Sequence, residues 1–470
     1  MRRTRRGVKG RWMILFLFCL GVFAAEESPA SEKPVLTLDQ VIGMAVEYSP
    51  QIREAEQDVK AAETDLAQAK AGQWAQMDIT AFGGPVQDAR TPVVLVTPSK
   101  DAEGFLRGQI KNRDETSIGF FGRLELSIVQ PLYTFGKISN RRDAAAHGLE
   151  AQKAAMEKKR GEVILTAKEY YFSYIVARQG IEAADDADTF IQDARRRIKR
   201  LIELKAKNAD ESDLYKLEAF EAEIQQFKVK AQTGAQMAYL ALKKHIGYPE
   251  DKDFELDRKT LPKDTRALGS QEEYTRKALS QRPEFEQIRR GIEARRALVE
   301  AAKADLYPSV FAAAVGSFAG APGRERMADS YIEDEFNHAY MGAILGANWH
   351  FDLGIGQARV RKARAEHQKM LHTQEYAEQN IPLEVAKYYQ DVIESQASFQ
   401  AYEKAAVAAR KWIVSAFSNF DMGVGPAKDI FDAIDRYGKN QGEYLLSLYN
   451  YHVSLAKLSY AVGEYRSQRY

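Results

Sequence analysis

Two periods of apolar residues organise this chain. Between residues 118 and 135 apolar and polar side chains alternate, which is typical of a strand with one apolar face. Beyond Gly136 the chain becomes rich in alanine and charge, and its apolar residues recur every seven positions. Those positions are Leu149, Met156, Val163, Tyr170 and Ala177. The pattern predicts a strand that leads directly into a long helix, ending near Lys205, which packs side by side with other helices.

A second strand, at residues 77–82, is predicted to pair with the first in a hairpin. We expect it to end at Gly83, Gly84 and Pro85, and we expect residues 85–117 to form a long loop. The apolar face of the 118–135 strand carries Ile118, Phe120, Leu124, Leu126 and Ile128, and the polar face carries Arg123, Glu125 and Ser127. A strand of a soluble β-sandwich alternates in the same way, so that alternative stays open for this strand taken alone.

The same order of elements occurs twice. A helix comes first, in residues 39–74 and again in 271–307, and Pro50 in the first copy corresponds to Pro283 in the second. A hairpin and a pair of long helices follow in each copy. We therefore expect two structural repeats, which cover residues 25–268 and 269–470.

The second hairpin should consist of residues 308–318 and 341–351. One face of its last strand carries Met341, Ala343, Leu345, Ala347, Trp349 and Phe351. Gly354 then begins a long helix, as Gly136 does in the first copy. Its apolar positions are again seven apart, at Val385, Val392, Phe399, Ala406, Ile413 and Phe420. A last helix is expected from about Lys428 to Gly463.

Residues 1–24 have the features of a secretory signal peptide. Basic residues precede a short apolar run at 12–23, and Ala24 is a small residue suited to cleavage. A membrane-spanning helix takes about 20 apolar residues, so an N-terminal anchor is the weaker alternative. Cys19, the only cysteine, leaves with this segment, and no disulfide is expected. With a net charge of only +1, composition gives no support for nucleic acid as a partner.

The strands limit how the chain can assemble. Alternating strands of this length are typical of transmembrane β-barrels, and such barrels have at least about 8 strands. One chain supplies only four strands. Two, three or four copies of the chain would therefore have to share one barrel. Aromatic residues stand at the helix-side ends of the strands, where membrane-interface aromatics belong, although buried core aromatics could occupy the same positions. They are Trp74, Tyr133, Phe135, Tyr307, Trp349 and Phe351.

Several motifs then occur in a fixed order. The strand exits read QPLYTFG at residues 130–136 and HFDLG at 350–354, and MGVG at 422–425 is followed by DIFDA at 429–433. In this order, and over essentially its whole mature length, the chain resembles the TolC family of outer-membrane efflux channels. The resemblance implies a mainly α fold with a small β part, in which long coiled-coil helices and two transmembrane β-hairpins of three chains build a 12-stranded β-barrel and a 12-helix α-barrel.

The resemblance also implies a function. A homotrimer in the cell outer membrane, with a large periplasmic part, would form the exit duct of a tripartite efflux or type I secretion system. It would be a passive conduit, opened by contact with a periplasmic adaptor protein and an inner-membrane pump of the RND or ABC type. The resemblance implies no catalysis, no cofactor and no metal site. The transported substrate stays open, because the pump largely selects it.

Two acidic residues match the family's periplasmic entrance. Asp429 and Asp432 stand where the resemblance implies an acidic ring, which three-fold symmetry would build from three copies of each. Such a ring attracts cations. The alternative is an ordinary acidic helix start that is stabilised by the helix dipole.

Other residues of the entrance are implied by the same resemblance. Gate-related positions are Asp213, Phe420 and Gly425, and Gly425 stands where some members have an arginine that helps to hold the entrance shut. Adaptor contact is expected at the two helix turns. The residues there are Asn208 and Ala209 in the first turn, and Met422, Gly423 and Val424 in the second.

Two other classes of protein were weighed. An enzyme has little support, because His367 and His372 lie on a polar helix without a set of metal ligands, and Gly354-Ile355-Gly356 lacks the context of a dinucleotide site. The runner-up is a periplasmic coiled-coil adaptor or structural protein. The duplication and the two alternating hairpins argue against it.

Overall fold

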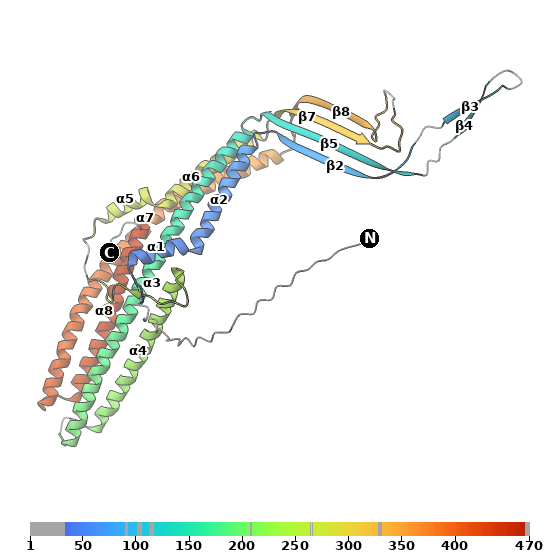
Figure 1. The fold of residues 1–470 in the computed structure, drawn as a ribbon. Helices are drawn as coiled ribbons and strands as arrows, with labels where there is room; N and C mark the ends of the chain where they lie inside the picture. The colour runs from blue at the N-terminus through green and yellow to red at the C-terminus, as the bar shows by residue number, and fades with distance from the viewer. Residues whose placement is uncertain are drawn as a thin grey trace, which may run out of the picture.

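The computed structural model is an elongated molecule with strands at one end and long helices at the other (Figure 1). It describes residues 33–89, 93–100, 106–111, 117–206, 209–263, 265, 267–327 and 331–465. The predicted signal peptide lies outside the described residues. A helical segment, a hairpin and two long helices follow one another in each half of the chain, as the duplicated pattern predicts. The boundary between residues 268 and 269 stays a prediction.

A four-stranded antiparallel sheet contains both predicted hairpins. Its strands lie in the order β2 (Gln76–Gln87), β5 (Ile118–Tyr133), β7 (Ser309–Gly320) and β8 (His338–Asn348). The two hairpins lie side by side because β5 of the first pairs with β7 of the second. The outer edges of the sheet are therefore β2 and β8.

Two strand boundaries were predicted wrongly. β2 does not end at Gly83 but continues through Pro85, and the expected loop at 85–117 contains a further hairpin of β3 (Val93–Lys100) and β4 (Leu106–Lys111). Pro85 is tolerated because β2 is an edge strand, where the missing N–H of proline can face away from its neighbour. β8 ends at Asn348, so the last apolar positions assigned to it, Trp349 and Phe351, follow the strand.

The strand register separates an apolar from a polar face. Residues paired directly across two strands lie on the same face, and the pairs Ile79–Leu126 and Ala312–Leu345 belong to the apolar one. Large side chains on that face are open to the surroundings, with exposed fractions of 63% for Ile79, 72% for Met341 and 79% for Leu345. No second sheet covers this face among the described residues, in contrast to a sandwich.

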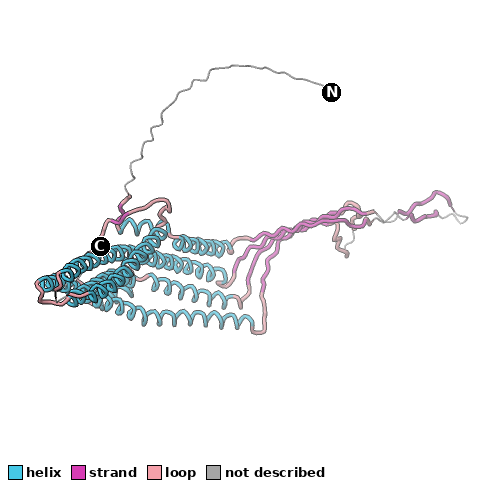
Figure 2. Tube along the Cα trace, turned by 90° about the horizontal axis from the view of Figure 1, so that it is seen from below, coloured by secondary structure: helices cyan, strands magenta, loops and turns pink. Residues whose placement is uncertain are grey.

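Each strand of the sheet continues into a helix. α2 (Pro50–Ala71) leads into β2, β5 leads into α3 (Lys137–Glu203), α6 (Pro283–Ala304) leads into β7, and β8 leads into α7 (Ile355–Asp421). The helices keep the order of the strands, because α2 packs on α3, α3 on α6 and α6 on α7 (Figure 2). Gly136 and Gly354 occupy the matching junctions before α3 and α7, both with positive φ.

The first helix of each repeat is broken. Single helices were predicted at 39–74 and 271–307, but the structure has α1 (Leu38–Tyr48) before α2 and α5 (Gln271–Gln281) before α6. The second helix of each pair starts at a proline, Pro50 or Pro283, which lacks an N–H and disfavours the helical conformation in the residue before it. Pro382, in contrast, lies inside α7, and the helix continues past it.

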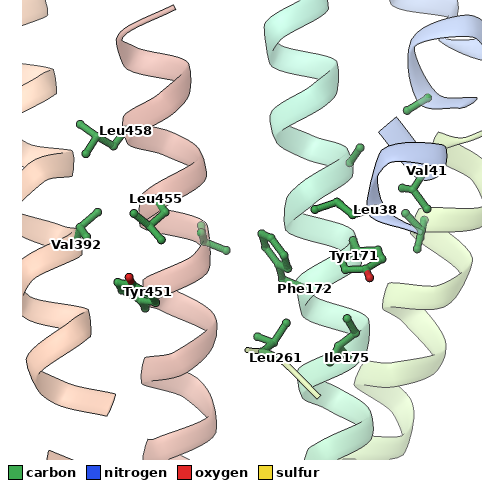
Figure 3. Packing of buried hydrophobic residues seen from close by; sticks show 14 of the residues in the cluster. Leu38, Val41, Tyr171, Phe172, Ile175, Leu261, Val392, Tyr451, Leu455 and Leu458 are labelled. Carbon is green, nitrogen blue, oxygen red and sulfur yellow. The ribbon is translucent and has the colours of Figure 1, made fainter. Parts of the chain in front are cut away.

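Two antiparallel helix pairs form the far end of the molecule. α3 packs on α4 (Glu211–His245), α7 packs on α8 (Ala427–Ala461), and the pairs meet where α3 packs on α8. All the predicted seven-residue positions of α7, from Val385 to Phe420, are buried. The core between the helices contains Tyr171, Phe172 and Ile175 of α3 and Tyr451 and Leu455 of α8 (Figure 3).

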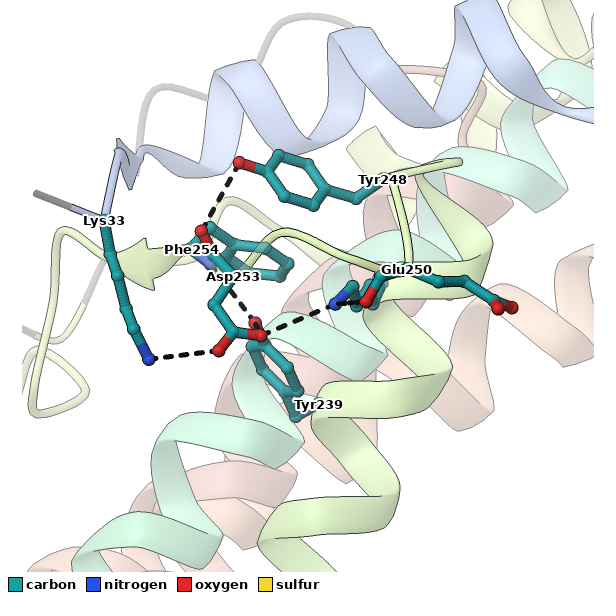
Figure 4. Close-up of polar contacts among 7 residues, drawn as sticks. Lys33, Tyr239, Tyr248, Glu250, Asp253 and Phe254 are labelled. Atoms are coloured by element: carbon teal, nitrogen blue, oxygen red, sulfur yellow. Dashed lines mark hydrogen bonds and ion pairs between the residues drawn. The ribbon is translucent and has the colours of Figure 1, made fainter. Parts of the chain in front are cut away.

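A network of polar contacts links the start of the described chain to α4 and the segment that follows it (Figure 4). Asp253 accepts hydrogen bonds from Lys33 and from the hydroxyl of Tyr239, both at 3.1 Å. The hydrogen bond from Lys33 is the main reason why the pKa of Asp253 lies below its ordinary value, whereas burial raises the pKa of Tyr239 to about 12. Beside the network, the short strands β1 (Val35–Leu36) and β6 (Glu255–Leu256) pair in parallel.

Candidate functional site at the helix turns

The two turns between the long helices lie together at the end of the molecule farthest from the sheet (Figure 1). The first joins α3 to α4 and the second joins α7 to α8. Below them, one apolar cluster receives side chains from all four helices, among them Ile198, Leu217, Ile413 and Ile430, each of which is buried. The turns are therefore held at fixed positions relative to each other.

Backbone hydrogen bonds in the second turn cap the C-terminus of α7. The N–H groups of Val424 and Gly425 both donate to the carbonyl oxygen of Asn419, at 3.0 and 3.2 Å. Gly423 takes a left-handed conformation with φ of 75°, and the space around its α-carbon is open. Met422 and Val424 project outward, with 69% and 77% of their surface exposed. The predicted contact residues of this turn thus form an exposed apolar tip.

The two predicted ring residues lie on one face of α8. Asp429 and Asp432 are three positions apart and both exposed, whereas Ile430 and Phe431 between them are buried. Burial of the apolar residues sets the rotation of the helix and turns the carboxylates outward. Among the described residues, neither carboxylate has a hydrogen-bond or ion-pair partner. Asp429 lies in the first turn of α8, where the helix dipole stabilises its charge, whereas Asp432 lies beyond that turn.

The gate-related residues lie elsewhere. Phe420 is completely buried in the tip cluster. Asp213 is 9% exposed, caps the start of α4 together with Asp210, and forms an ion pair with Lys216 at 3.2 Å. Gly425 is buried, and a side chain added there would place its β-carbon 3.1 Å from that of Asn419. The structure therefore places none of the three on the exposed face of Asp429 and Asp432. In the first turn Ala209 is half-buried, and Asn208 lies outside the described residues.

A match to a family model decides the identity of the fold. The model of the outer membrane efflux protein family matches residues 41–203 and 275–464, which together make up more than half of the chain. This chain belongs to that family. The resemblance to TolC-type channels seen in the sequence is thereby confirmed, and so is the mainly helical fold with its small sheet.

Solved structures of outer-membrane channels share this fold. The outer-membrane channel OprN is 19% identical, with a TM-score of 0.73, and the match covers 91% of this chain and 89% of OprN. The open state of the Neisseria gonorrhoeae channel MtrE is 17% identical, with a TM-score of 0.68 and coverages of 91% and 89%. VceC from Vibrio cholerae is 17% identical, with a TM-score of 0.65 and coverages of 91% and 96%. Among curated proteins, no sequence matches this chain.

The family assignment concerns channels and gives no sign of an enzyme. In the described part of the chain, no group of three or more His, Cys, Asp or Glu residues could hold a metal ion. Within the same residues, no helix combines the length and the apolar character needed to cross a membrane.

In this efflux family member, the aromatic residues at the junction of sheet and helices are all exposed. Phe135 lies between Tyr133 and Tyr307, with ring centroids 4.7 and 5.4 Å apart, and Trp349 lies 4.3 Å from Phe351. The indole N–H of Trp349 also donates to the carbonyl oxygen of Leu306. Trp74 is 67% exposed just before β2. Their assignment to a membrane interface stays a prediction.

Sequence reasoning missed Arg197, which joins the two helix pairs of this efflux protein at their tips. Its guanidinium forms an ion pair with Asp421 at the end of α7 and lies 4.8 Å from the ring centroid of Phe417. Nearby, a hydrogen bond from Arg195 is the main reason why the pKa of Glu221 lies below its ordinary value. The run Arg195-Arg196-Arg197 in the last turns of α3 was the available signal.

Proposed function

We propose that this protein is a trimeric outer-membrane channel that forms the exit duct of a tripartite efflux or secretion system. The observation that carries the proposal is the four-stranded sheet, whose apolar face is uncovered and whose edges, β2 and β8, have no strand partner within the described residues. Pairing of β2 with β8 of a neighbouring copy would satisfy both edges. Three copies would close a barrel of about 12 strands, within the range of membrane barrels.

The helices support the same assembly. Because the order α2, α3, α6, α7 repeats the order of the strands, closing the sheet would also arrange the helices in a ring beneath it. The wall formed by the strands would thus continue as a helical wall into the periplasm. The channel is passive in this proposal, and a pump in the inner membrane supplies its cargo through a periplasmic adaptor.

Fractionation of membranes tests the assembly. We expect the protein to stay in the membrane pellet after a carbonate wash and to run on a gel as a trimer that heating converts to monomer. A protein that a carbonate wash releases as a monomer would contradict the proposal and would favour the adaptor or structural alternative.

The helix turns are proposed as the periplasmic entrance. Asp429 and Asp432 would line it in three copies, and the exposed tip at Met422, Gly423 and Val424, together with Ala209 and the predicted Asn208, would meet the adaptor. The support for the acidic lining is that both carboxylates are exposed on one face of α8 and have no ion-pair partner among the described residues. In a ring they would attract cations.

Single-channel recording with a trivalent cation on the helical side tests the entrance. Asp429→Ala combined with Asp432→Ala should weaken the block at least about tenfold, because each unit-charge contact at about 4 Å in water contributes about 1 kcal/mol. Asp435→Ala is the matched control, since that carboxylate lies one turn further along α8 and is already bound to Lys439 at 2.8 Å. An unchanged block in the double variant would refute the acidic lining.

A further inference from the structure

Three phenyl rings form a row on the polar face of the sheet. The ring of Phe121 lies edge-to-face with Phe82 of β2 and with Phe336 of the β7–β8 loop, at centroid distances of 6.1 and 5.1 Å. Phe82 is 49% exposed, and apart from Phe121 its neighbours on this face include the charged Arg123 and Glu125. A single exposed apolar side chain needs no special explanation, but apolar groups gathered on one face and rimmed by polar residues mark binding sites.

The register shows that the rings lie opposite the apolar face. In β5 the alternation puts Phe121, Arg123 and Glu125 on one face and Phe120 and Leu124 on the other. Arg123 pairs directly with Phe82 across the strands, lies 5.9 Å from its ring centroid and forms an ion pair with Glu125 at 2.7 Å. The row of rings therefore belongs to the face that would line the lumen of a closed barrel.

The loop between β7 and β8 is held across the ends of β2 and β5. Asp334, which is 8% exposed, accepts the backbone N–H groups of Met327, Phe336 and Asn337 at 2.9 to 3.1 Å. Arg324 donates to the carbonyl oxygen of Gln87 at 2.8 Å, and its guanidinium lies 4.2 Å from the ring centroid of Phe336. These contacts fix Phe336 above Phe121.

We infer that Phe82, Phe121 and Phe336 form an aromatic collar near the exit of the channel, and that aromatic solutes contact this collar as they leave. The inference rests on the proposed function, because only a closed barrel turns the polar face into a lumen. In three copies the collar would be a ring of phenyl groups flanked by the guanidinium groups of Arg123 and Arg324. Edge-to-face contacts and cation–π contacts attract flat aromatic molecules, whereas small aliphatic solutes gain neither.

Block of single-channel current by 2-naphthalenesulfonate, added on the sheet side, tests the collar, with methanesulfonate as the aliphatic control. An anion is chosen because the acidic residues at the far entrance repel it. The wild type should be blocked by the aromatic anion alone. Phe121→Leu and Phe82→Leu, which remove a ring but keep most of the apolar volume, should each weaken the block between about twofold and tenfold.

Phe120→Leu is the matched control, because Phe120 is the neighbour of Phe121 on the same strand but lies on the apolar face, 67% exposed. 2-Naphthalenesulfonate should block the current of Phe120→Leu as strongly as that of the wild type. Equal block in Phe121→Leu and the wild type, or equal loss in Phe120→Leu and Phe121→Leu, would overturn the collar. A wild-type protein that forms no channels would instead refute the proposed function itself.

Discussion

The two helix turns at the tip of the molecule occupy equivalent places in the repeats but are built differently. After α3, Lys205 takes the left-handed conformation with φ of 55°, and α4 begins with a reciprocal cap in which Asp210 and Asp213 each accept the other's N–H. After α7, Gly423 takes that conformation, and α8 begins directly after Pro426 without any side-chain cap. The same bend is thus made with different chemistry.

The difference decides which carboxylates are available for function. In the first turn, Asp210 and Asp213 are engaged at the start of their helix and contribute to its stability. In the second turn, Asp429 occupies the matching position in the first turn of α8 but takes part in no side-chain cap, and Asp432 follows on the same face. Neither carboxylate has a side-chain partner in the described structure. The first turn thus uses its carboxylates to cap a helix, whereas the second leaves Asp429 and Asp432 available for the proposed acidic lining.

The largest expected effect comes from the core that the turns share. Phe420→Ala should destabilise the protein by about 3–5 kcal/mol, because it leaves a cavity where a completely buried ring packs between both helix pairs. Thermal unfolding followed by circular dichroism in detergent measures it. Phe227→Ala on α4, where the ring is 40% exposed, serves as control and should cost much less. Similar losses in both variants would show that the turns do not depend on a common core.

A smaller effect is expected where the turns bend. Gly423→Ala should cost about 1 kcal/mol through backbone strain alone, since the space around Gly423 is open. Lys205→Gly should have the opposite sign and stabilise the first turn by up to about 1 kcal/mol. Melting temperatures of the two variants test the pair, and a change in the same direction would contradict the assigned conformations.

The smallest effect is local and depends on pH. Hydrogen bonds from the Ser212 hydroxyl and from the backbone N–H of Asp213 lower the pKa of Asp210 below its ordinary 3.8. A lowered folded-state pKa means that the stabilisation is complete above 3.8 and is lost as the pH falls below it. Hydrogen exchange, corrected for its intrinsic rate, should therefore rise at the start of α4 as the pH falls from about 4 to about 2. The start of α8 should not respond, and a parallel response would remove the distinction between the turns.

Much of this architecture was readable in the linear pattern. The alternation in 118–135 and the seven-residue spacing in α7 predicted strand, face and core correctly, because burial of one face imposes the period of the element on the sequence. Three of the errors lay at prolines. Pro50 and Pro283 were read as parts of continuous helices, and Pro85 was read as the end of a strand that in fact continues. Pro50 and Pro283 interrupt helices whose hydrogen bonds are local, whereas the effect of Pro85 depends on a neighbouring strand that lies farther along the sequence.

The sequence by itself determined the order of the elements, the duplication, and the exposed position of Asp429 and Asp432, since a helix with buried Ile430 and Phe431 must turn these carboxylates outward. Only the tertiary structure showed that β5 pairs with β7, that Arg197 joins the two helix pairs, and that Phe336 lies over Phe121. Such contacts join residues separated by long stretches of chain, and periodicity carries no information about them. They arise from packing between elements. Through this packing, the two similar halves of the chain share one sheet and one helical tip.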